Sequence, residues 1–439
     1  MNRLLSGHRP WRAVVLALLV GMATLARGAE PGVEIRDGDR IVLLGGTFIE
    51  RLQVEGFLEC QLVSAFRDRR FSVRNLGWSG DTVWGEARAV FGTPQDGFQR
   101  LLKDTRDAKP TLILLQYGGN EAQAGSAGLE EFVTQYGRLL DALATTQARL
   151  VLLSPPRREK VPGPLPDPAS YNGYLAEYAQ RIAELARQRG LAYVPALDLY
   201  DPLPDQVGAT DPTTRFYFTD NGLHPHAVGA AIVAERLATK LGAPPARWQV
   251  RLADRAVQQA QGVAVRELDW SAQQVRFRAT AGRLPSPTIL AHGLRSRPGQ
   301  AERSSDTSGA GAPATRVVRP DQIAELAVAG LAAGEYELLV DGKAVAKGTA
   351  EQWQAGVKFE LTTDVAQADA LRKAIQDKDQ LYFHRYRPQN ETYLFLFRKH
   401  EQGNNAVEIP QFDPLVAAQE AALLELRTPR ERTCELRRL

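Results

Sequence analysis

Cysteine is scarce in this sequence, and its scarcity limits how the fold can be stabilised. Only Cys60 and Cys434 occur among 439 residues. A disulfide framework of the kind that holds small secreted domains together is therefore excluded. Cys60 falls in a helix-like run over 50–66 and is predicted to be a small core residue. A single Cys60–Cys434 bridge is the alternative.

A large excess of charge of either sign is also missing. Lys and Arg number 54 and Asp and Glu number 51, which gives a net charge of +3. Basic residues are scattered, so neither nucleic acid nor anionic lipid is expected as a partner. Residues 427–438 are rich in Arg but alternate with Glu431 and Glu435, and we predict a solvated helix end there.

Long apolar runs are absent except near the N-terminus. Arginines within the first twelve residues precede an apolar stretch over 13–26, and the small residues Ala26 and Gly28 follow. This pattern predicts a signal peptide over 1–28. The stretch is shorter than the ~20 residues that a membrane span needs. We expect an exported protein, periplasmic or extracellular, without a membrane span; a retained anchor is the alternative.

A regular alternation of strand-like and helix-like segments occupies residues 38–243. Apolar runs predict strands at 41–44, 71–76, 111–117, 149–154 and 191–197. Apolar residues at helical spacing lie between them, and the last helix is expected from about 226 to 241. Such alternation predicts an α/β fold with a mostly parallel sheet covered on both faces. Ligands of these sheets bind at the C-terminal ends of the strands.

The pattern changes after residue 245. Residues 245–350 are predicted to be β-rich, with a flexible loop at 296–316 and a hairpin turning at Asp341-Gly342. Residues 351–439 are predicted to be mostly helical. Aromatic and polar residues gather between 382 and 397. Such a group is typical of core packing, and a surface that stacks on a sugar is the alternative.

Four polar turns punctuate the α/β segment, each at the end of an apolar run or just before the last helix. Because parallel strands end at one edge of their sheet, we expect all four turns to lie close together. They are Gly45-Gly46-Thr47, Ser79-Gly80-Asp81, Gly118-Gly119-Asn120 and Asn221-Gly222-Leu223-His224.

In this order and on these elements, the turns resemble the four blocks of the SGNH (GDSL-type) hydrolases. The resemblance covers roughly residues 40–243 and implies a three-layer, flavodoxin-like SGNH domain over 38–243. It implies ester hydrolysis through an acyl-enzyme, with Thr47 as the nucleophile and His224 as the base. The oxyanion hole would be formed by Thr47, Gly80 and Asn120.

The first departure from the SGNH pattern is at the nucleophile. Thr47 stands where the family has a serine, and its extra methyl group crowds the oxygen and stiffens χ1. A helix cap is the alternative role for Thr47. Ser79 and Ser154 are rival hydroxyls, although neither stands on the family's nucleophile block.

The second departure is at the residue that orients the base. Asn221 stands three residues before His224, where the family has an aspartate. In serine proteases, replacing the orienting Asp by Asn lowers turnover by about 10⁴ because the wrong imidazole tautomer forms. Asp220 as the orienting carboxylate, Asn221 in that role, and neither of them are the three alternatives.

These observations favour an exported esterase or deacylase that acts on a small-molecule or polysaccharide ester. A binding or structural protein that kept the fold and lost the chemistry is the main alternative, and direct activation of water by His224 is another. His224 and His226 flank Pro225, but without a cluster of further ligands they are a weak metal signal. No common phosphate-binding loop occurs. We therefore expect neither a metal nor a cofactor.

Overall fold

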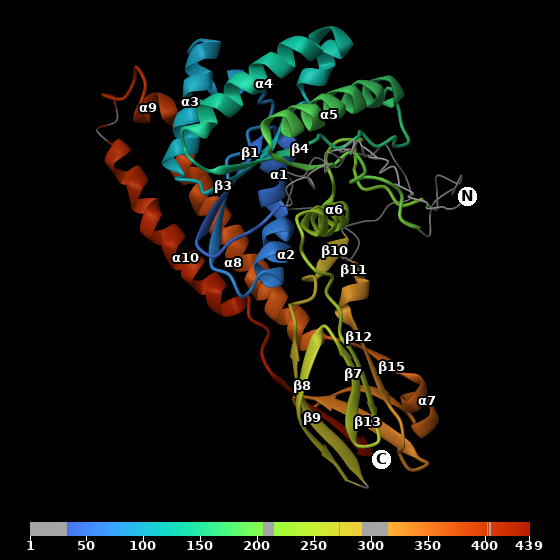
Figure 1. Cartoon of the computed structure of the whole chain (residues 1–439). Coiled ribbons are helices and arrows are strands. Elements are labelled where there is room, and N and C mark those ends of the chain that lie inside the picture. Colours follow the sequence, from blue (N-terminus) through green and yellow to red (C-terminus); the bar gives the residue numbers. More distant parts are fainter. Residues whose placement is uncertain (1–32, 205–214, 272, 292–314, 402, 404) are drawn as a thin grey trace, which may run out of the picture.

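The computed structural model describes residues 33–204, 215–271, 273–291, 315–401, 403 and 405–439. The predicted signal peptide lies outside these ranges, as does the predicted loop at 296–316 up to residue 314. Figure 1 shows a helix-covered sheet at one end of the molecule and a β-rich part at the other. Within the described ranges, no helix combines the length and apolar character needed to cross a membrane.

A parallel sheet of five strands forms the centre of the first part, which we call the α/β domain. The strands are β1 (Asp39–Gly45), β2 (Phe71–Asn75), β3 (Leu112–Gln116), β4 (Arg149–Leu153) and β5 (Ala192–Val194). Their order is β2-β1-β3-β4-β5, and every neighbouring pair is parallel. All five predicted strands are confirmed. This is the flavodoxin-like order, whose direction reverses between β1 and β3, where ligands bind.

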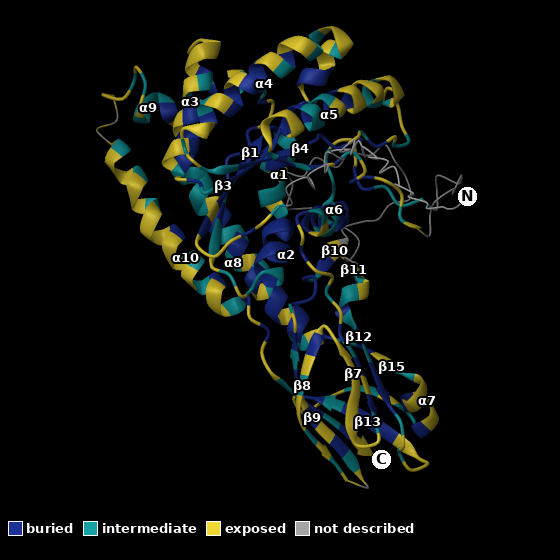
Figure 2. Cartoon of the chain, in the orientation of Figure 1, coloured by how far each residue is buried: buried dark blue, intermediate teal, exposed yellow. Residues whose placement is uncertain are grey.

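Alternate residues of the strands face two separate cores. Ile41 and Leu43 of β1 point into one core, whereas Val42 and Leu44 point into the other. The first core is covered by α1 (Thr47–Glu55), α2 (Phe57–Ala65) and α6 (Ala227–Lys240). The second is covered by α3 (Pro94–Asp107), α4 (Leu129–Ala144) and α5 (Ala169–Arg189). Figure 2 shows the buried sheet between helices with exposed outer faces. The predicted three-layer fold is confirmed.

The helical run expected over 50–66 is two helices, because Gly56 interrupts it. Gly56 has a left-handed φ of 66°, which ends α1 and starts α2. Cys60 lies within α2 and is buried, as predicted. Cys60 and Cys434 are both free thiols, so the alternative of a bridge between them is wrong.

The second part of the chain is a β sandwich. One sheet has the order β15-β12-β6-β7 and the other β14-β13-β16-β9-β8. Side chains from both sheets share one core, which includes Trp248, Phe277 and Trp353. The strands of the first sheet are β6 (Gln249–Ala253), β7 (Ala256–Gln261), β12 (Ile323–Val328) and β15 (Val357–Glu360). The strands of the second are β8 (Val263–Trp270), β9 (Gln274–Ala281), β13 (Glu335–Val340), β14 (Lys343–Thr349) and β16 (Arg432–Arg438).

The hairpin predicted at Asp341-Gly342 is confirmed. β13 and β14 pair in antiparallel fashion on either side of this turn. Both turn residues have positive φ, 49° for Asp341 and 79° for Gly342. Positive φ at both central residues is what a two-residue turn needs to match the twist of its strands. Two further short strands, β10 (Ile289–Ala291) and β11 (Thr315–Val317), pair separately.

The prediction of a solvated helix end at 427–438 is wrong. Residues 432–438 form β16, which lies between β9 and β13 in the middle of its sheet. Cys434 and Leu436 are buried in the sandwich core, whereas Glu435 pairs outward with Arg276 at 3.1 Å. In β16 only Cys434 and Leu436 show the apolar alternation that is typical of a strand. The charged residues around them made this alternation too weak to predict a strand from the sequence.

Helices return from the sandwich to the α/β domain. α8 (Thr362–Tyr386) runs beside α10 (Phe412–Leu426), and both lie along the flank of the molecule (Figure 1). α7 (Ala350–Ala355) and α9 (Glu391–Leu394) are shorter. Tyr386 at the end of α8 donates a hydrogen bond to the carbonyl of Gly77 at 3.0 Å. Tyr382 and Phe383 pack on the same core as Tyr386, so these three aromatics are core packing, whereas Phe395 and Phe397 of the same group are exposed.

A buried ion cluster joins α8 to the α/β domain. Lys378 is fully buried, and its Nζ lies 2.6 and 2.5 Å from the two carboxylate oxygens of Glu59 in α2. The same nitrogen donates to the carbonyl of Val73 in β2 at 3.0 Å and lies 3.0 Å from Asp379. A buried charge needs such partners because its desolvation is costly. The cluster therefore fixes α8 in one position against α2 and β2.

Candidate active site

All four polar turns, the second through Asp81, line one cavity at the C-terminal edge of the parallel sheet. Thr47, Asn120 and His224 all contribute to its wall, together with the aromatic rings of Tyr171 and Tyr200. The cavity measures about 60 Å³. One water molecule needs roughly 10–15 Å³ of such space, so the cavity holds a small chemical group.

Thr47 sits at the start of α1 and its hydroxyl is available. The N-cap is Gly46, and no side chain caps this helix, so the alternative role of Thr47 as a helix cap is wrong. The hydroxyl oxygen of Thr47 accepts a hydrogen bond from the backbone N–H of Gly80 at 3.2 Å. As the first residue of the helix, Thr47 also has a backbone N–H with no intrahelical partner.

The second and third turns are tied to each other beside Thr47. The side-chain nitrogen of Asn120 donates to the carbonyl of Asp81 at 2.8 Å. One of its two N–H groups is used in this bond, and the other has no acceptor among the described residues, so it can meet a ligand in the cavity. Gly80 has a φ of 81°, a conformation that favours glycine. Gly80 therefore presents its N–H to the Thr47 oxygen from a tight turn.

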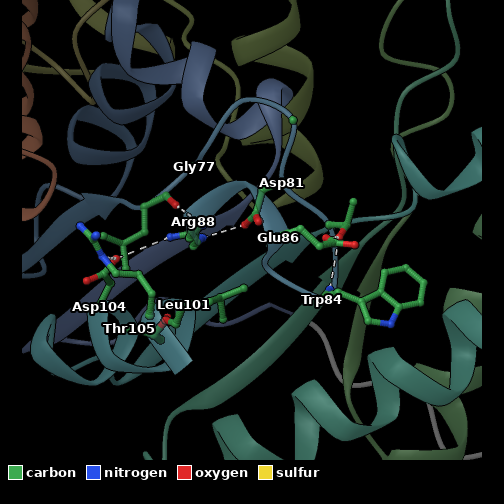
Figure 3. Close-up of polar contacts among 12 residues, drawn as sticks. Gly77, Asp81, Trp84, Glu86, Arg88, Leu101, Asp104 and Thr105 are labelled. Carbon is green, nitrogen blue, oxygen red and sulfur yellow. Dashed lines mark hydrogen bonds and ion pairs between the residues drawn. The ribbon is translucent and has the colours of Figure 1, made fainter. Parts of the chain in front are cut away.

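The carboxylate of Asp81 faces the protein interior. It accepts a hydrogen bond from Arg88 Nε at 2.8 Å and another from the hydroxyl of Tyr117 at 3.1 Å. Figure 3 shows Asp81 and Arg88 pointing toward each other, with Asp104 on the far side of the guanidinium. Arg88 also donates to the carbonyl of Leu76 at 2.8 Å. This buried network, which the sequence did not reveal, holds the Gly80 turn in place.

Glu121 binds backbone groups of the same two turns. Its carboxylate accepts the backbone N–H groups of Val83 at 2.9 Å and of Gly118 at 2.8 Å. Complete burial raises the pKa of Glu121 to about 7. Because it joins the turn before Asn120 to the segment after Gly80, Glu121 fixes the spacing of the two oxyanion candidates.

Asn221 contacts the ring of His224 directly. The side-chain nitrogen of Asn221 lies 3.1 Å from His224 Nδ1. The side-chain oxygen of Asn221 accepts the backbone N–H groups of Leu223 at 3.1 Å and of His224 at 2.8 Å. Because these two bonds fix the side-chain oxygen of Asn221, its amide nitrogen faces the ring and donates to Nδ1. In the neutral ring the proton is then carried by Nε2.

Asp220 does not take the orienting position. Its backbone N–H donates to the carbonyl of His224 at 3.3 Å, but among the described residues no hydrogen bond joins its carboxylate to the ring. Its negative charge only acts at a distance and favours the protonated ring. Of the alternatives, Asn221 is therefore the residue that touches His224.

The loop that carries His224 is anchored by a buried glutamate. Glu159 accepts hydrogen bonds from the backbone N–H of Phe218 at 3.1 Å and from both the backbone and the hydroxyl of Thr219, at 2.9 and 2.7 Å. Gly222 packs on the same residue: a Cβ at this position would lie 2.6 Å from the carbonyl oxygen of Glu159. Only glycine fits there, and its φ of 80° makes the turn.

The environment of His224 favours the neutral ring. Partial burial lowers its pKa, the positive charge of Arg51 lowers it further, and Asp220 opposes both. The ring therefore stays unprotonated at neutral pH. Both His224 and Thr47 line the cavity, but no hydrogen bond joins the ring to the Thr47 hydroxyl in the part of the chain that the structure describes.

His226, Ser154 and Ser79 are not placed to act in the cavity. His226 caps α6: its Nδ1 accepts the N–H of Gly229 at 3.2 Å and its Nε2 donates to the carbonyl of Tyr217 at 2.6 Å. Both ring nitrogens are occupied, so His226 cannot bind a metal beside His224 without losing these bonds. The hydroxyl of Ser154 is buried and accepts the N–H of Ala196 at 2.7 Å. Ser79 does not line the cavity.

Two arginines in the cavity wall were missed by the sequence analysis. Arg51 lies one helical turn after Thr47 in α1, and Arg158 follows β4. Helical spacing from Thr47 is a signal that could have identified Arg51. Arg158 belongs to no motif, and only the folded chain brings it to the site.

One family model matches part of this chain. Residues 54–232 match the GDSL-like lipase/acylhydrolase family. The matched segment includes Gly80, Asn120 and His224 and begins after Thr47. No curated protein sequence matches the chain significantly.

A solved structure described as BT4096, a gut microbial diltiazem-metabolizing enzyme, aligns over almost the whole chain. It has 15% sequence identity and a TM-score of 0.64, and the alignment covers 92% of this chain and 99% of that one. Over the aligned 92% of this chain, the fold is therefore shared. Axe2, an acetylxylan esterase from Geobacillus stearothermophilus, aligns with 18% identity and a TM-score of 0.35, over 47% of this chain and 96% of its own.

Proposed function

We propose that the α/β domain, which matches the GDSL-like lipase/acylhydrolase family over residues 54–232, hydrolyses esters with Thr47 as nucleophile and His224 as base. One observation carries the proposal. The hydroxyl of Thr47 lies in the same small cavity as the His224 ring and the Asn120 amide, and it already contacts the N–H of Gly80 at 3.2 Å. Nucleophile, base and oxyanion donors thus meet at one point.

The proposed reaction has two stages. The Thr47 oxygen attacks the ester carbonyl carbon and transfers its proton to His224 Nε2. The N–H groups of Gly80 and Thr47 and the amide of Asn120 hold the oxyanion. Collapse of the tetrahedral intermediate expels the alcohol, which takes the proton from His224 and leaves an acyl group on Thr47. Water, deprotonated by His224, then hydrolyses this acyl-enzyme.

Asn221 makes this reaction slow. A base must present an unprotonated Nε2, whereas a donor at Nδ1 favours the tautomer that carries its proton on Nε2. The productive tautomer has a proton on Nδ1 that faces the Asn221 amide. Rotating this amide by half a turn would set its NH₂ group against two backbone N–H groups. We therefore propose a working but weak base.

The substrate we propose is an ester with a short acyl group. The cavity of about 60 Å³ has room for a group of acetyl size, and the longer half of the substrate would extend into solvent. A small molecule and an acylated polysaccharide both fit this description. The predicted signal peptide at 1–28 favours a substrate outside the cytoplasm.

A second candidate function follows from the same tautomer. With a proton on Nε2, His224 joins Gly80 and Asn120 as a third donor toward the cavity. Three donors bind a carbonyl oxygen well without cleaving anything. A binding protein that retains acyl groups is therefore the alternative to a slow hydrolase.

Hydrolysis of 4-nitrophenyl acetate by the purified chain tests the proposal, with Thr47→Ala and His224→Ala as matched variants. We expect slow hydrolysis that both variants abolish, and a stalled acetyl group on a Thr47 peptide by mass spectrometry. Hydrolysis that survives Thr47→Ala but not His224→Ala would favour direct activation of water. Equal background rates for all three proteins would favour the binding protein.

A further inference from the structure

Two arginine side chains in the cavity wall, Arg51 and Arg158, have no acidic partner among the residues that the structure describes. From them we infer that the site selects esters that carry a carboxylate close to the scissile bond. This inference rests on the proposed function and names the class of substrate.

Arg51 stands beside the nucleophile. It lies four residues after Thr47 in α1, so the two side chains project from the same face of the helix. The acidic residues of α1 form ion pairs with other arginines: Glu55 with Arg372 at 2.5 Å, and Glu50 with Arg387 at 3.3 Å. Among the described residues, no carboxylate forms an ion pair with Arg51. Its charge is therefore free to meet a ligand.

Arg158 is held rigidly on the side of the cavity near Asn120. Its guanidinium lies over the ring of Tyr171, with 3.7 Å between its central carbon and the ring centroid. The hydroxyl of Tyr171 in turn donates to the carbonyl of Gly119, next to Asn120. Arg158 Nε is buried and has no hydrogen-bond partner within the described part of the chain. An orphaned buried donor of this kind indicates a missing acceptor.

The acidic residues of the cavity do not neutralise these arginines. The carboxylate of Asp81 is bound by Arg88 and Tyr117, and that of Glu121 accepts two backbone N–H groups. Both carboxylates are thus engaged in the protein interior. The neighbouring Arg157 shows the usual arrangement, since it is exposed and lies 3.5 Å from Asp201. Arg51 and Arg158 have no such carboxylate within the described ranges of the chain.

A guanidinium suits a carboxylate because its parallel N–H donors match the two oxygens. The stack on Tyr171 covers one face of the Arg158 plane, so its donors are presented edge-on. Arg51 adds a second positive charge near the attacked carbonyl. A substrate carboxylate between them would also orient the ester toward Thr47.

A matched pair of acetyl esters tests this inference: 4-acetoxybenzoate, which is anionic, and 4-acetoxybenzamide, which has the same shape and no charge. We expect kcat/KM to favour the anion by about 10- to 100-fold, the range for hydrogen bonds to a charged group. The preference should weaken as salt is raised, because salt screens exposed charges.

Arg51→Gln and Arg158→Gln should each remove most of this preference, measured for each variant as the ratio of its own kcat/KM values for the two esters at a pH where His224 is neutral. Arg158→Lys keeps the charge and loses the planar fork, so it should restore the preference only in part. Arg157→Gln is the matched control, since Arg157 lies outside the cavity, and it should retain the full preference. Thermal unfolding of each variant verifies that it is folded.

The outcomes separate the two proposals. Equal hydrolysis of both esters, or a preference for the neutral one, would overturn the inference and leave the ester hydrolase standing. If neither ester is cleaved, the proposed function fails, and calorimetric binding of 4-hydroxybenzoate against 4-hydroxybenzamide then decides. Selective binding of the anion that Arg51→Gln and Arg158→Gln abolish would support the inference. Equal binding, or none, would refute it.

Discussion

The side-chain amide of Asn221 donates a hydrogen bond to Nδ1 of His224 over 3.1 Å. An aspartate in this position would accept a hydrogen bond from the ring, so the direction of the bond is reversed. The reversal follows from two backbone N–H groups that occupy the Asn221 oxygen. Consequently Nε2, the nitrogen that a base needs, carries a proton in the neutral ring.

Asn221→Asp should therefore raise the rate of ester hydrolysis. A carboxylate can accept hydrogen bonds from the same two backbone N–H groups and also from Nδ1–H of the ring. This would free Nε2 to act as the base. We expect kcat for 4-nitrophenyl acetate to rise by up to about 10⁴, the reverse of the loss seen when serine proteases lose this carboxylate. Asn221→Leu removes the amide without supplying an acceptor and should give no such rise. An unchanged rate in Asn221→Asp would mean that His224 is not the base.

Thr47→Ser should also increase turnover. Removing the γ-methyl group frees χ1 and uncovers the attacking oxygen. Relief of about 1.4 kcal/mol, near the upper end for a strained rotamer, corresponds to a tenfold larger kcat. Thr47→Val has a similar shape and no hydroxyl, so it serves as the control. Burst and steady-state kinetics of the three proteins measure the effect, and residual activity in Thr47→Val equal to wild type would exclude Thr47 as the nucleophile.

The pH dependence of hydrolysis should report on His224. Burial and the charge of Arg51 hold its pKa below the ordinary value of about 6.5. The ring must be neutral to act, so kcat/KM should stay on its plateau down to a pH below 6.5 and fall only in more acidic solution. Arg51→Gln removes a lowering charge and should move this acidic limb to higher pH on a neutral ester. Arg157→Gln should leave the limb in place. A limb that does not move would show that another group governs it.

The ion cluster at Lys378 should be essential for stability. Lys378→Met leaves the carboxylates of Glu59 and Asp379 buried without their partner, which should cost about 3–5 kcal/mol of unfolding free energy. Adding Glu59→Gln should recover part of this loss. Lys373→Met, at an exposed pair with Asp377 in the same helix, should cost about 0.5 kcal/mol or less. Urea unfolding of the variants measures these differences, and equal losses at both lysines would contradict the assigned role.

The parallel sheet was predictable because its strands carry an uninterrupted apolar signal. β3 and β4 are apolar at nearly every position, as central strands covered on both faces must be. In β16 the signal rests on Cys434 and Leu436 alone, between arginines and glutamates that suit a helix surface equally well. Pairing with β9 and β13 decides its structure, and those partners lie about a hundred residues or more away in sequence.

The site was predictable to the extent that chain topology determines it. Turns at the C-terminal ends of parallel strands must share an edge, and this brought Thr47, Asn120 and His224 to one cavity. The direction of the bond between Asn221 and His224 depends on local backbone geometry, which no residue pattern encodes. Arg158, in the segment after β4, is held at the cavity by its stack on Tyr171 of α5. Such contacts arise only from the folded chain.

The position of β16 bears on the order of events during biosynthesis. β9 and β13 are synthesised long before residues 432–438, yet neither pairs with the other, because the strand between them comes last. Until the ribosome has passed residue 438, two strand edges stand open with their backbone groups unpaired, a state prone to aggregation. The second sheet of the sandwich is therefore completed only when β16 pairs with β9 and β13.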